Sequence, residues 1–196
     1  MNSKFIVIEG LDATGKSTLA PKLGNRLGAA LLQCPPNLES LDLSPNLRAH
    51  FDNRPPNQRR AYYRAANLIA SEMAEVALKA GHVVMDRYWP STVAFAALDG
   101  NSDLVQEWQG SYPPELRKPD AVILLTVNEE NRRRRMRGRG EPVTAEEQNL
   151  EFIQRREAVL GEYRQFHPIE IDTSDRDADT VLDIVIAALH SADIIV

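Results

Sequence analysis

Apolar runs and amphipathic segments alternate along the chain and predict an alternation of strands and helices. Short apolar runs predict five buried strands, at residues 5–8, 29–33, 82–85, 121–127 and 169–172. Apolar residues at helical spacing, or helix-forming composition, predict helices at residues 17–27, 47–51, 57–80, 91–98, 128–137, 144–165 and 179–190. Strands separated by helices indicate an α/β fold, in which a parallel sheet carries helices on both faces.

Signals at the ends of these elements make the prediction more specific. Gly81 is expected at the C′ position after the long helix, and residues 138–142 are expected to break the helix after the fourth strand. Thr144 and Glu147 are spaced as a capping box for the next helix. Residues 99–119 have no clear periodicity and are expected to form mostly loop. We find no repeat or linker, so residues 1–196 are expected to form a single domain.

Composition narrows the class of protein. The chain has 196 residues, of which 43% are hydrophobic and 26% charged, as is ordinary for a globular domain with a sizeable core. Its net charge of −5 argues against a general attraction to nucleic acid, and no apolar run is long enough to span a bilayer. The single cysteine, Cys34, excludes an intrachain disulfide and is expected to be a small buried residue. The first strand follows the N-terminus directly, so a cytoplasmic location is expected.

The most informative motif follows the first strand. Residues 10–17, GLDATGKS, fit the phosphate-binding pattern G-x-x-x-x-G-K-[ST]. Glycines let such a loop approach a ligand closely, and its N–H groups converge on phosphate oxygens at a helix N-terminus. Lys16 is placed to reach the β- and γ-phosphates, and Ser17 to bind Mg²⁺. A chance match in a turn is the alternative, but the strand before the motif and the helix formers after it argue against a chance match. The expected nucleotide-binding residues are Gly10, Asp12, Ala13, Thr14, Gly15, Lys16, Ser17 and Thr18.

Two charged residues, Asp86 and Arg87, follow the third strand. The carboxyl ends of parallel strands meet at one edge of a sheet, so both are expected in the crevice near Ser17. Asp86 could bind Mg²⁺ directly or through water, or it could cap the next helix. Arg87 could hold a second phosphate by a bidentate contact, or it could form a surface salt bridge.

Six arginines crowd residues 132–139. Such a run is usually a solvated face or a nucleic-acid patch. Here it follows a core strand and ends in a glycine-containing break within an acidic chain, which favours a mobile lid over about residues 132–144 that closes arginines onto a phosphoryl group. Arg135 and Arg139 share a helix face and Arg137 lies at the break, so these three are the candidate catalytic cations. The other arginines are expected to face water.

Taken together and in order, several segments resemble the thymidylate kinase family. They are EGLDATGKST, DRYWPST, LRKPDAVILLTV, RGRGE and FIQRREAVLGEY. Four segments look most similar to the UMP/CMP kinase 2 branch, which is known in animal mitochondria: GLDATGK, CPP, RRAYYRAANLIASEMA and DRYWPST. The resemblance implies a three-layer P-loop NTPase fold with a five-stranded parallel sheet, and a nucleoside monophosphate kinase that uses ATP and Mg²⁺. It also implies a possible homodimer, and a mitochondrial matrix location if a leader has been removed.

The resemblance further implies roles for individual residues. Lys16 and Ser17 would hold the ATP phosphates and Mg²⁺, which Asp86 would support. Asp12 would approach the sugar and phosphate of the acceptor nucleotide. Arg87 would grip the acceptor phosphate, Tyr63 would stack on the acceptor base, and the arginines from Arg135 to Arg139 would close over the phosphates.

Three positions depart from the family pattern. Ala13 stands where some thymidylate kinases have an arginine, so the transition-state cation is expected from the lid. Asn67 stands where other thymidylate kinases have a base-reading arginine, and its amide could match cytosine or uracil; a helix-surface asparagine is the alternative. Asn37 lies near the place of the usual acceptor-phosphate arginine, and the candidate substitutes are Arg48, Arg59 and Arg60.

These observations lead to one main hypothesis, an ATP-dependent kinase that phosphorylates (d)CMP or UMP. A dTMP kinase is the alternative within the class. A nucleotide-dependent switch is a second alternative, but the N/T-K-x-D base-reading motif typical of GTPases is missing from the sequence. A nucleic-acid binder built on the arginine run is the third, and the net charge of −5 argues against it.

Overall fold

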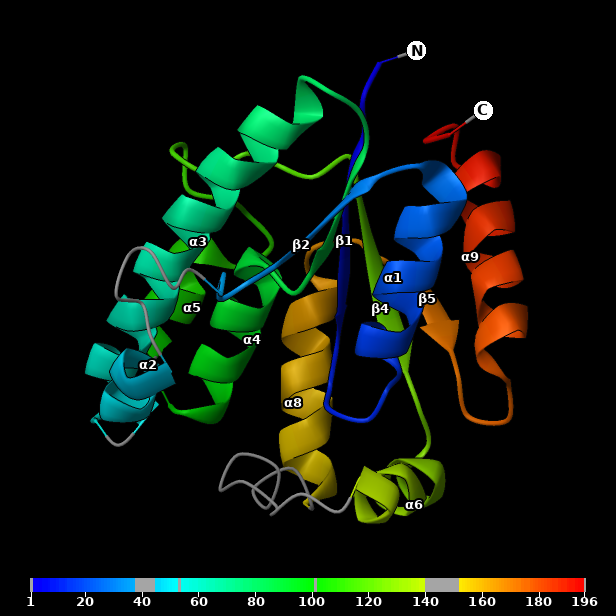
Figure 1. The fold of residues 1–196 in the computed structure, drawn as a ribbon. Coiled ribbons are helices and arrows are strands. Elements are labelled where there is room, and N and C mark those ends of the chain that lie inside the picture. The colour runs from blue at the N-terminus through cyan, green and yellow to red at the C-terminus, as the bar shows by residue number, and fades with distance from the viewer. Residues whose placement is uncertain (1, 38–44, 53, 101, 140–151, 196) are drawn as a thin grey trace.

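The computed structural model describes residues 2–37, 45–52, 54–100, 102–139 and 152–195, and within them it contains a five-stranded sheet (Figure 1). The strands pair in parallel in the order β2-β3-β1-β4-β5. Their bounds are β1 Phe5–Gly10, β2 Ala30–Gln33, β3 Val83–Asp86, β4 Ala121–Thr126 and β5 Ile169–Asp172. The predicted parallel sheet is therefore confirmed.

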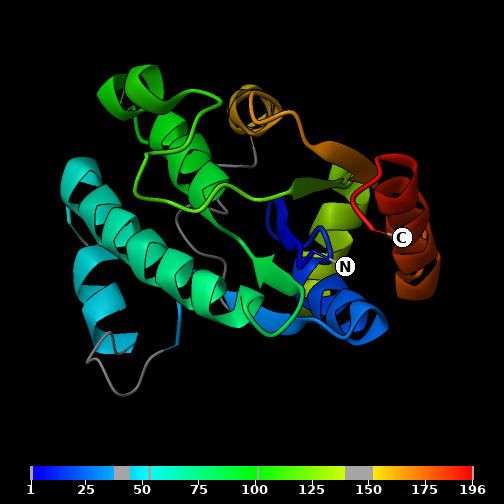
Figure 2. The ribbon, with the colours of Figure 1, turned by 90° about the horizontal axis from the view of Figure 1, so that it is seen from above.

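Helices cover both faces of this sheet, which gives the predicted three layers (Figure 2). Helices α1 (Lys16–Leu27) and α9 (Ala178–Ser191) pack on one face. The other face carries α3 (Pro56–Leu78), α4 (Trp89–Leu98) and α8 (Ile153–Arg164). The remaining described helices are α2 (Pro45–Asp52), α5 (Ser102–Trp108) and α6 (Glu129–Arg139). None of the helices in the described ranges has the length and apolar character needed to cross a membrane.

The central strand β1 shows why the sheet is buried on both faces. Phe5 and Val7 point into the core shared with α3 and α4, whereas Ile6 and Ile8 point into the core shared with α1 and α9. All four side chains are fully buried. A continuous apolar run is what a central parallel strand requires, because successive side chains point to opposite faces.

Three details of the predicted boundaries differ from the structure. Helix α3 ends at Leu78 and Gly81 does not adopt the left-handed conformation, so the predicted glycine C′ cap is wrong. Helix α6 continues through Gly138, because a glycine lowers helix stability by only about 1 kcal/mol and does not by itself end a helix. Helix α4 begins at Trp89, two residues before the predicted start. The predicted capping box at Thr144 and Glu147 lies outside the described residues.

Helix α5 lies within a stretch that was expected to be loop. It is too short for a helical period to stand out in the sequence. Its last residue, Trp108, packs edge to face on Trp89 of α4, with ring centroids 6.1 Å apart. Tertiary packing rather than local pattern therefore accounts for this helix.

Candidate active site

The phosphate-binding loop lies between the carboxyl end of β1 and the start of α1, and glycine is required at its first position. A Cβ on Gly10 would lie 2.4 Å from the backbone oxygen of Leu125, and the backbone φ there is +141°. Gly15 has φ +100° and directly precedes α1. Ala13 adopts φ +66°, which is unusual for a residue with a Cβ. The loop is thus closely packed and leads directly into the N-terminus of α1, which favours phosphate binding.

Lys16 is almost fully buried beneath this loop. Its ammonium donates a 2.7 Å hydrogen bond to the carbonyl of Leu11. Burial, and after it the nearby positive charge of Arg87, lower the pKa of Lys16 to about 7, although the charges of Asp12 and Asp86 act in the opposite direction. Phosphate oxygens placed beside this ammonium would favour its charged form.

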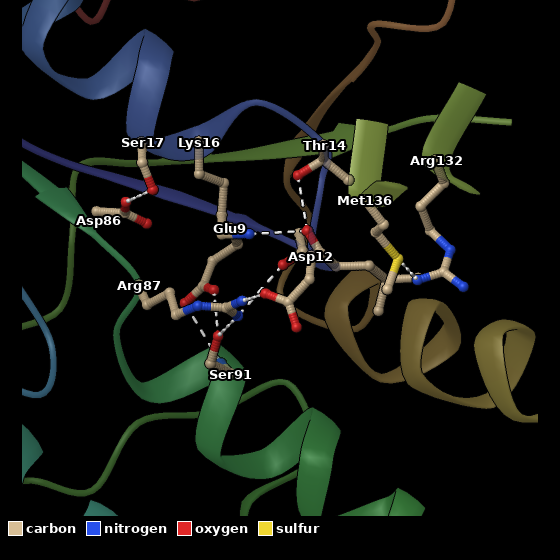
Figure 3. A network of polar contacts seen from close by, with 12 residues as sticks. Glu9, Asp12, Thr14, Lys16, Ser17, Asp86, Arg87, Ser91, Arg132 and Met136 are labelled. Atoms are coloured by element: carbon tan, nitrogen blue, oxygen red, sulfur yellow. Dashed lines mark hydrogen bonds and ion pairs between the residues drawn. The ribbon is translucent and has the colours of Figure 1, made fainter. Parts of the chain in front are cut away.

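Ser17 and Asp86 come together at the edge where β1 and β3 end. The Ser17 hydroxyl donates to Oδ2 of Asp86 at 3.1 Å (Figure 3). The other carboxylate oxygen, Oδ1, is buried and has no hydrogen-bond partner among the described residues. The Ser17 hydroxyl and the Asp86 carboxylate both supply oxygen ligands, and Oδ1 can still accept. Such oxygens are the ligands that a hard cation such as Mg²⁺ prefers. Asp86 does not cap α4, because Oδ2 accepts from Ser17 and Oδ1 accepts no bond from the described residues.

Arg87 follows Asp86 and reaches back to the phosphate loop (Figure 3). One guanidinium nitrogen pairs with Asp12 at 2.5 Å. Another donates to the Gly10 carbonyl at 3.3 Å and to the Ser91 hydroxyl at 3.2 Å. These three contacts hold the guanidinium over the loop, so the alternative of an ordinary surface salt bridge does not describe Arg87.

A space of about 410 Å³ opens beside Ser17 and Asp86. Apolar side chains from β2 and α3, including Leu32 and Met73, form part of its wall, and Gln33 and Asn37 contribute polar groups. The predicted metal-binding pair therefore lies on an accessible cavity.

The predicted lid arginines have three different environments. Arg135 donates to the Ala13 carbonyl at 3.2 Å and to the Thr173 hydroxyl at 2.9 Å, so it connects α6 to the phosphate loop. Arg137 is exposed, and the side chain of Arg139 lies outside the described part of the chain. Arg132 was expected to face water, which is wrong: it is 1% exposed and pairs with Glu129 at 2.7 Å, because α6 packs this side inward.

The predicted acceptor residues on α3 are also in contact with one another. Asn67 is fully buried, which rules out a helix-surface position. Its amide nitrogen donates to the Tyr63 carbonyl at 2.7 Å and to the Thr92 hydroxyl at 2.8 Å, whereas its oxygen Oδ1 has no partner among the described residues. The Tyr63 hydroxyl lies 3.3 Å from Oδ1 of Asp52.

The candidate substitutes for the acceptor-phosphate arginine lie in two places. Arg48 is 56% exposed and lies 3.5 Å from a carboxylate oxygen of Asp52. Arg59 and Arg60 both pair with Asp99 at the end of α4. Arg87 is thus the arginine that the structure brings to the phosphate loop from the carboxyl end of β3.

Sequence reasoning missed Glu9, the last side chain before the loop. It is fully buried, and burial raises its pKa to about 7, although the Ser91 hydrogen bond and the Arg87 charge act in the opposite direction. The signal was available: Glu9 is a charged residue in the otherwise apolar run FIVIEG. Thr173 was also missed, and its hydroxyl donates to the Thr14 carbonyl at 3.0 Å.

Comparisons with known proteins show the family to which the chain belongs. A family model described as thymidylate kinase matches residues 8–184. The chain is 34% identical over 158 residues to human (Homo sapiens) "UMP-CMP kinase 2, mitochondrial", covering 76% of this chain and 33% of that protein. The chain thus spans about a third of the length of this relative. It is 28% identical to a "probable thymidylate kinase" of Methanocaldococcus jannaschii, with 97% of this chain and 98% of that protein covered.

Solved structures share the fold. The thymidylate kinase of Candida albicans superposes with a TM-score of 0.72 at 18% identity, covering 98% of this chain and 93% of that one. A deoxyadenosine kinase of M. mycoides superposes with a TM-score of 0.63 at 18% identity, covering 95% and 99%. At this identity the structural matches establish the arrangement of strands and helices, and the sequence matches establish the family.

Proposed function

Because this chain belongs to the thymidylate kinase family of nucleoside monophosphate kinases, we propose that it transfers the γ-phosphoryl group of ATP to (d)CMP or UMP. The observation that carries the proposal is the meeting of Lys16, the Ser17–Asp86 pair and Arg87 at adjacent strand ends. Lys16 lies at the start of α1 and Arg87 follows β3, so two positively charged side chains lie beside one phosphate loop. This arrangement suits the binding of a donor phosphate and an acceptor phosphate next to each other. A thymidylate kinase remains the alternative within the family.

In this proposal the protein acts by positioning and by neutralising charge. The loop N–H groups and Lys16 would hold the ATP phosphates, and Arg87 would hold the acceptor phosphate. Oxygens of Ser17 and Asp86 would hold Mg²⁺, which when bound neutralises developing charge on the phosphates. Asp12, which pairs with Arg87, would turn toward the acceptor sugar.

The proposed lid supplies the remaining positive charge. Arg135 already contacts the Ala13 carbonyl of the phosphate loop, which supports a role for α6 at this site. Arg137 and Arg139 continue the same helix, and we propose that they close over the transferring group with Arg135. The loop has Ala13 rather than a cation at this point, so α6 is the source of the proposed transition-state charge.

Asn67 supports a preference for cytosine. Both N–H groups of its amide are already donated, so the amide can offer only its oxygen, which is an acceptor. A buried acceptor without a partner costs about 1–3 kcal/mol, and a donor on the base would recover that energy. At its 4-position cytosine presents an amino donor where uracil and thymine present a carbonyl, so a contact of the amide oxygen at that position would select cytosine. Because the amide is covered, a base reaches it only where a neighbouring side chain moves aside.

A steady-state assay with CMP, dCMP, UMP and dTMP as acceptors tests the proposal. We expect CMP or dCMP to give the highest kcat/KM, at least tenfold above dTMP, in line with the cost of the unpaired acceptor. A preference for dTMP would establish the alternative and overturn the argument from Asn67. ATP hydrolysis that is independent of every acceptor would instead favour a nucleotide-dependent switch.

The compartment and assembly belong to the same proposal. The human relative is named as a mitochondrial protein, which supports the mitochondrial matrix beside the cytoplasm as a place of action. A homodimer is proposed from the family resemblance alone.

A further inference from the structure

The buried carboxylate of Glu9, on strand β1, caps the N-terminus of helix α4. Helix α4 has Tyr88 as its N-cap residue, and no side chain of the N-cap itself satisfies the helix terminus. Oε1 of Glu9 instead accepts the Tyr88 N–H at 2.8 Å and the Ser91 N–H at 3.3 Å. The Tyr88 N–H is one of the groups that a helix start leaves without an intrahelical partner, whereas the Ser91 N–H is shared between Glu9 and the Tyr88 carbonyl, which lies 3.1 Å away. A negative charge at a helix N-terminus is favourable. The last residue of β1 before the phosphate loop thus fixes the start of α4.

Ser91 connects this carboxylate to Arg87. The Ser91 hydroxyl lies 2.6 Å from Oε2 of Glu9, 3.2 Å from a guanidinium nitrogen of Arg87 and 2.9 Å from the Tyr163 hydroxyl. A hydroxyl has one hydrogen and two lone pairs. The hydrogen goes to the Glu9 carboxylate, so the lone pairs accept from Arg87 and from Tyr163. Every hydrogen-bonding position of Ser91 is therefore used, and its orientation is fixed. Figure 3 shows the contacts with Glu9 and Arg87.

The backbone of Arg87 needs this support. Its φ of +66° is a left-handed conformation, which costs energy for a residue with a Cβ and persists where the surroundings impose it. The backbone is anchored at Arg87 and at the next residue: the Arg87 N–H donates to the Ile8 carbonyl at 2.9 Å, and the Tyr88 N–H donates to Glu9. Backbone and guanidinium are thus both held by groups that converge on Glu9 and the end of β1.

We propose that Glu9 and Ser91 are positioning residues for Arg87, which keep its guanidinium aimed at the phosphate of the acceptor. The inference rests on the proposed function, in which Arg87 binds that phosphate. Glu9 acts through the start of α4 and through the Ser91 hydroxyl, whereas Ser91 contacts the guanidinium directly. Neither residue touches the base or sugar in this scheme, so their loss should weaken only the part of the affinity that depends on the phosphate.

Isothermal titration of the whole chain with CMP and, separately, with cytidine tests this inference. The two ligands differ by the phosphate alone. Ser91→Ala removes the hydroxyl that orients Arg87, and we expect CMP affinity to fall about tenfold, as for a lost hydrogen bond to a charged group, with cytidine affinity unchanged. Glu9→Gln keeps the shape but places an NH₂ group against a Ser91 oxygen that already accepts two hydrogen bonds, so a similar selective loss is expected.

Two further variants serve as controls. Ser91→Thr keeps the hydroxyl and should restore CMP binding to within about threefold of the wild type. Tyr163→Phe removes a hydroxyl that bonds to Ser91 and leaves the bond between Ser91 and Arg87 in place, so CMP binding should fall much less than in Ser91→Ala. An equal loss of CMP and cytidine binding in Ser91→Ala would point to general damage and overturn the inference, as would unchanged CMP binding in both Ser91→Ala and Glu9→Gln.

This experiment separates the inference from the function beneath it. If the wild type turns over none of the pyrimidine acceptors, the proposed function fails. A CMP-selective loss in Ser91→Ala would then still support the positioning of Arg87. If the wild type turns over CMP and Ser91→Ala binds it normally, the function stands and the positioning role fails.

Discussion

The exchange Arg87→Lys tests the geometry of the candidate site most closely, because it keeps the charge and changes only the shape. The arginine guanidinium reaches Asp12 with one nitrogen, and Gly10 and Ser91 with another. A lysine ammonium is a single point on a flexible stem and cannot make both sets of contacts. About two hydrogen bonds from a charged donor would be lost, at roughly 1.5 kcal/mol each. A total of about 3 kcal/mol corresponds to roughly a hundredfold.

We therefore expect kcat/KM for CMP to fall about a hundredfold in Arg87→Lys, with the KM for ATP nearly unchanged. The assay couples ADP formation to a spectrophotometric readout at saturating ATP and varied CMP. Arg164→Lys is the matched control. Arg164 on α8 pairs with Glu170 on β5, away from the phosphate loop. If Arg87→Lys stays within threefold of the wild type while its thermal unfolding is unchanged, Arg87 does not bind the acceptor phosphate.

Three more predictions concern stability and its dependence on pH. Gly10→Ala should lower stability by about 2 kcal/mol or more and abolish ATP binding, because the new Cβ would lie 2.4 Å from the Leu125 oxygen at φ +141°; a melting temperature equal to that of the wild type would contradict this. Burial raises the pKa of Glu9 from 4.5 to about 7 in the folded chain, so the folded state binds the proton more tightly and stability attributable to Glu9 is lost as pH rises from about 4.5 to 7. Wild-type stability relative to Glu9→Gln should fall between pH 5 and pH 8, by up to about 3 kcal/mol, and denaturant titrations that give the same difference at both pH values would refute this assignment. Arg132→Ala should lower the free energy of unfolding by about 2 kcal/mol, because this arginine is 1% exposed and paired with Glu129. Arg133→Ala should change it by less than about 0.5 kcal/mol, because that side chain is 52% exposed. Equal effects of the two exchanges in urea titrations would count against this packing of α6.

Features that depend on short-range pattern could be predicted from the sequence. The strands at β1 and β4 are continuous apolar runs, and such runs have few other stable placements than the centre of a parallel sheet. The phosphate loop is defined by residue types at fixed spacing within one strand–loop–helix unit. The meeting of Ser17 with Asp86 followed from topology, since both lie at carboxyl ends of strands in one parallel sheet.

Features that depend on long-range packing could not be predicted in the same way. Glu9 becomes a buried cap only because α4 starts beside the end of β1, at residues about 80 positions later. Arg132 lies within a run of arginines that reads as solvated, yet Glu129 and the packing of α6 bury it. Asn67 could be placed on a helix by pattern, but its burial depends on the contact with Thr92 of α4. For Glu9 and Asn67 the deciding partner belongs to another element, and for Arg132 the local pair with Glu129 is joined by Arg156 of α8, 3.4 Å from the same carboxylate.

The fate of the γ-phosphoryl group tests the central claim most directly. Wild-type protein is incubated with ATP labelled at the γ-phosphate, Mg²⁺ and CMP, and the labelled products are separated by chromatography. The proposed kinase activity predicts that the label moves into CDP in an amount equal to the ADP formed, and that no transfer occurs without CMP. Label found only in inorganic phosphate, at a rate that CMP does not change, would contradict the claim that this chain is a pyrimidine nucleoside monophosphate kinase.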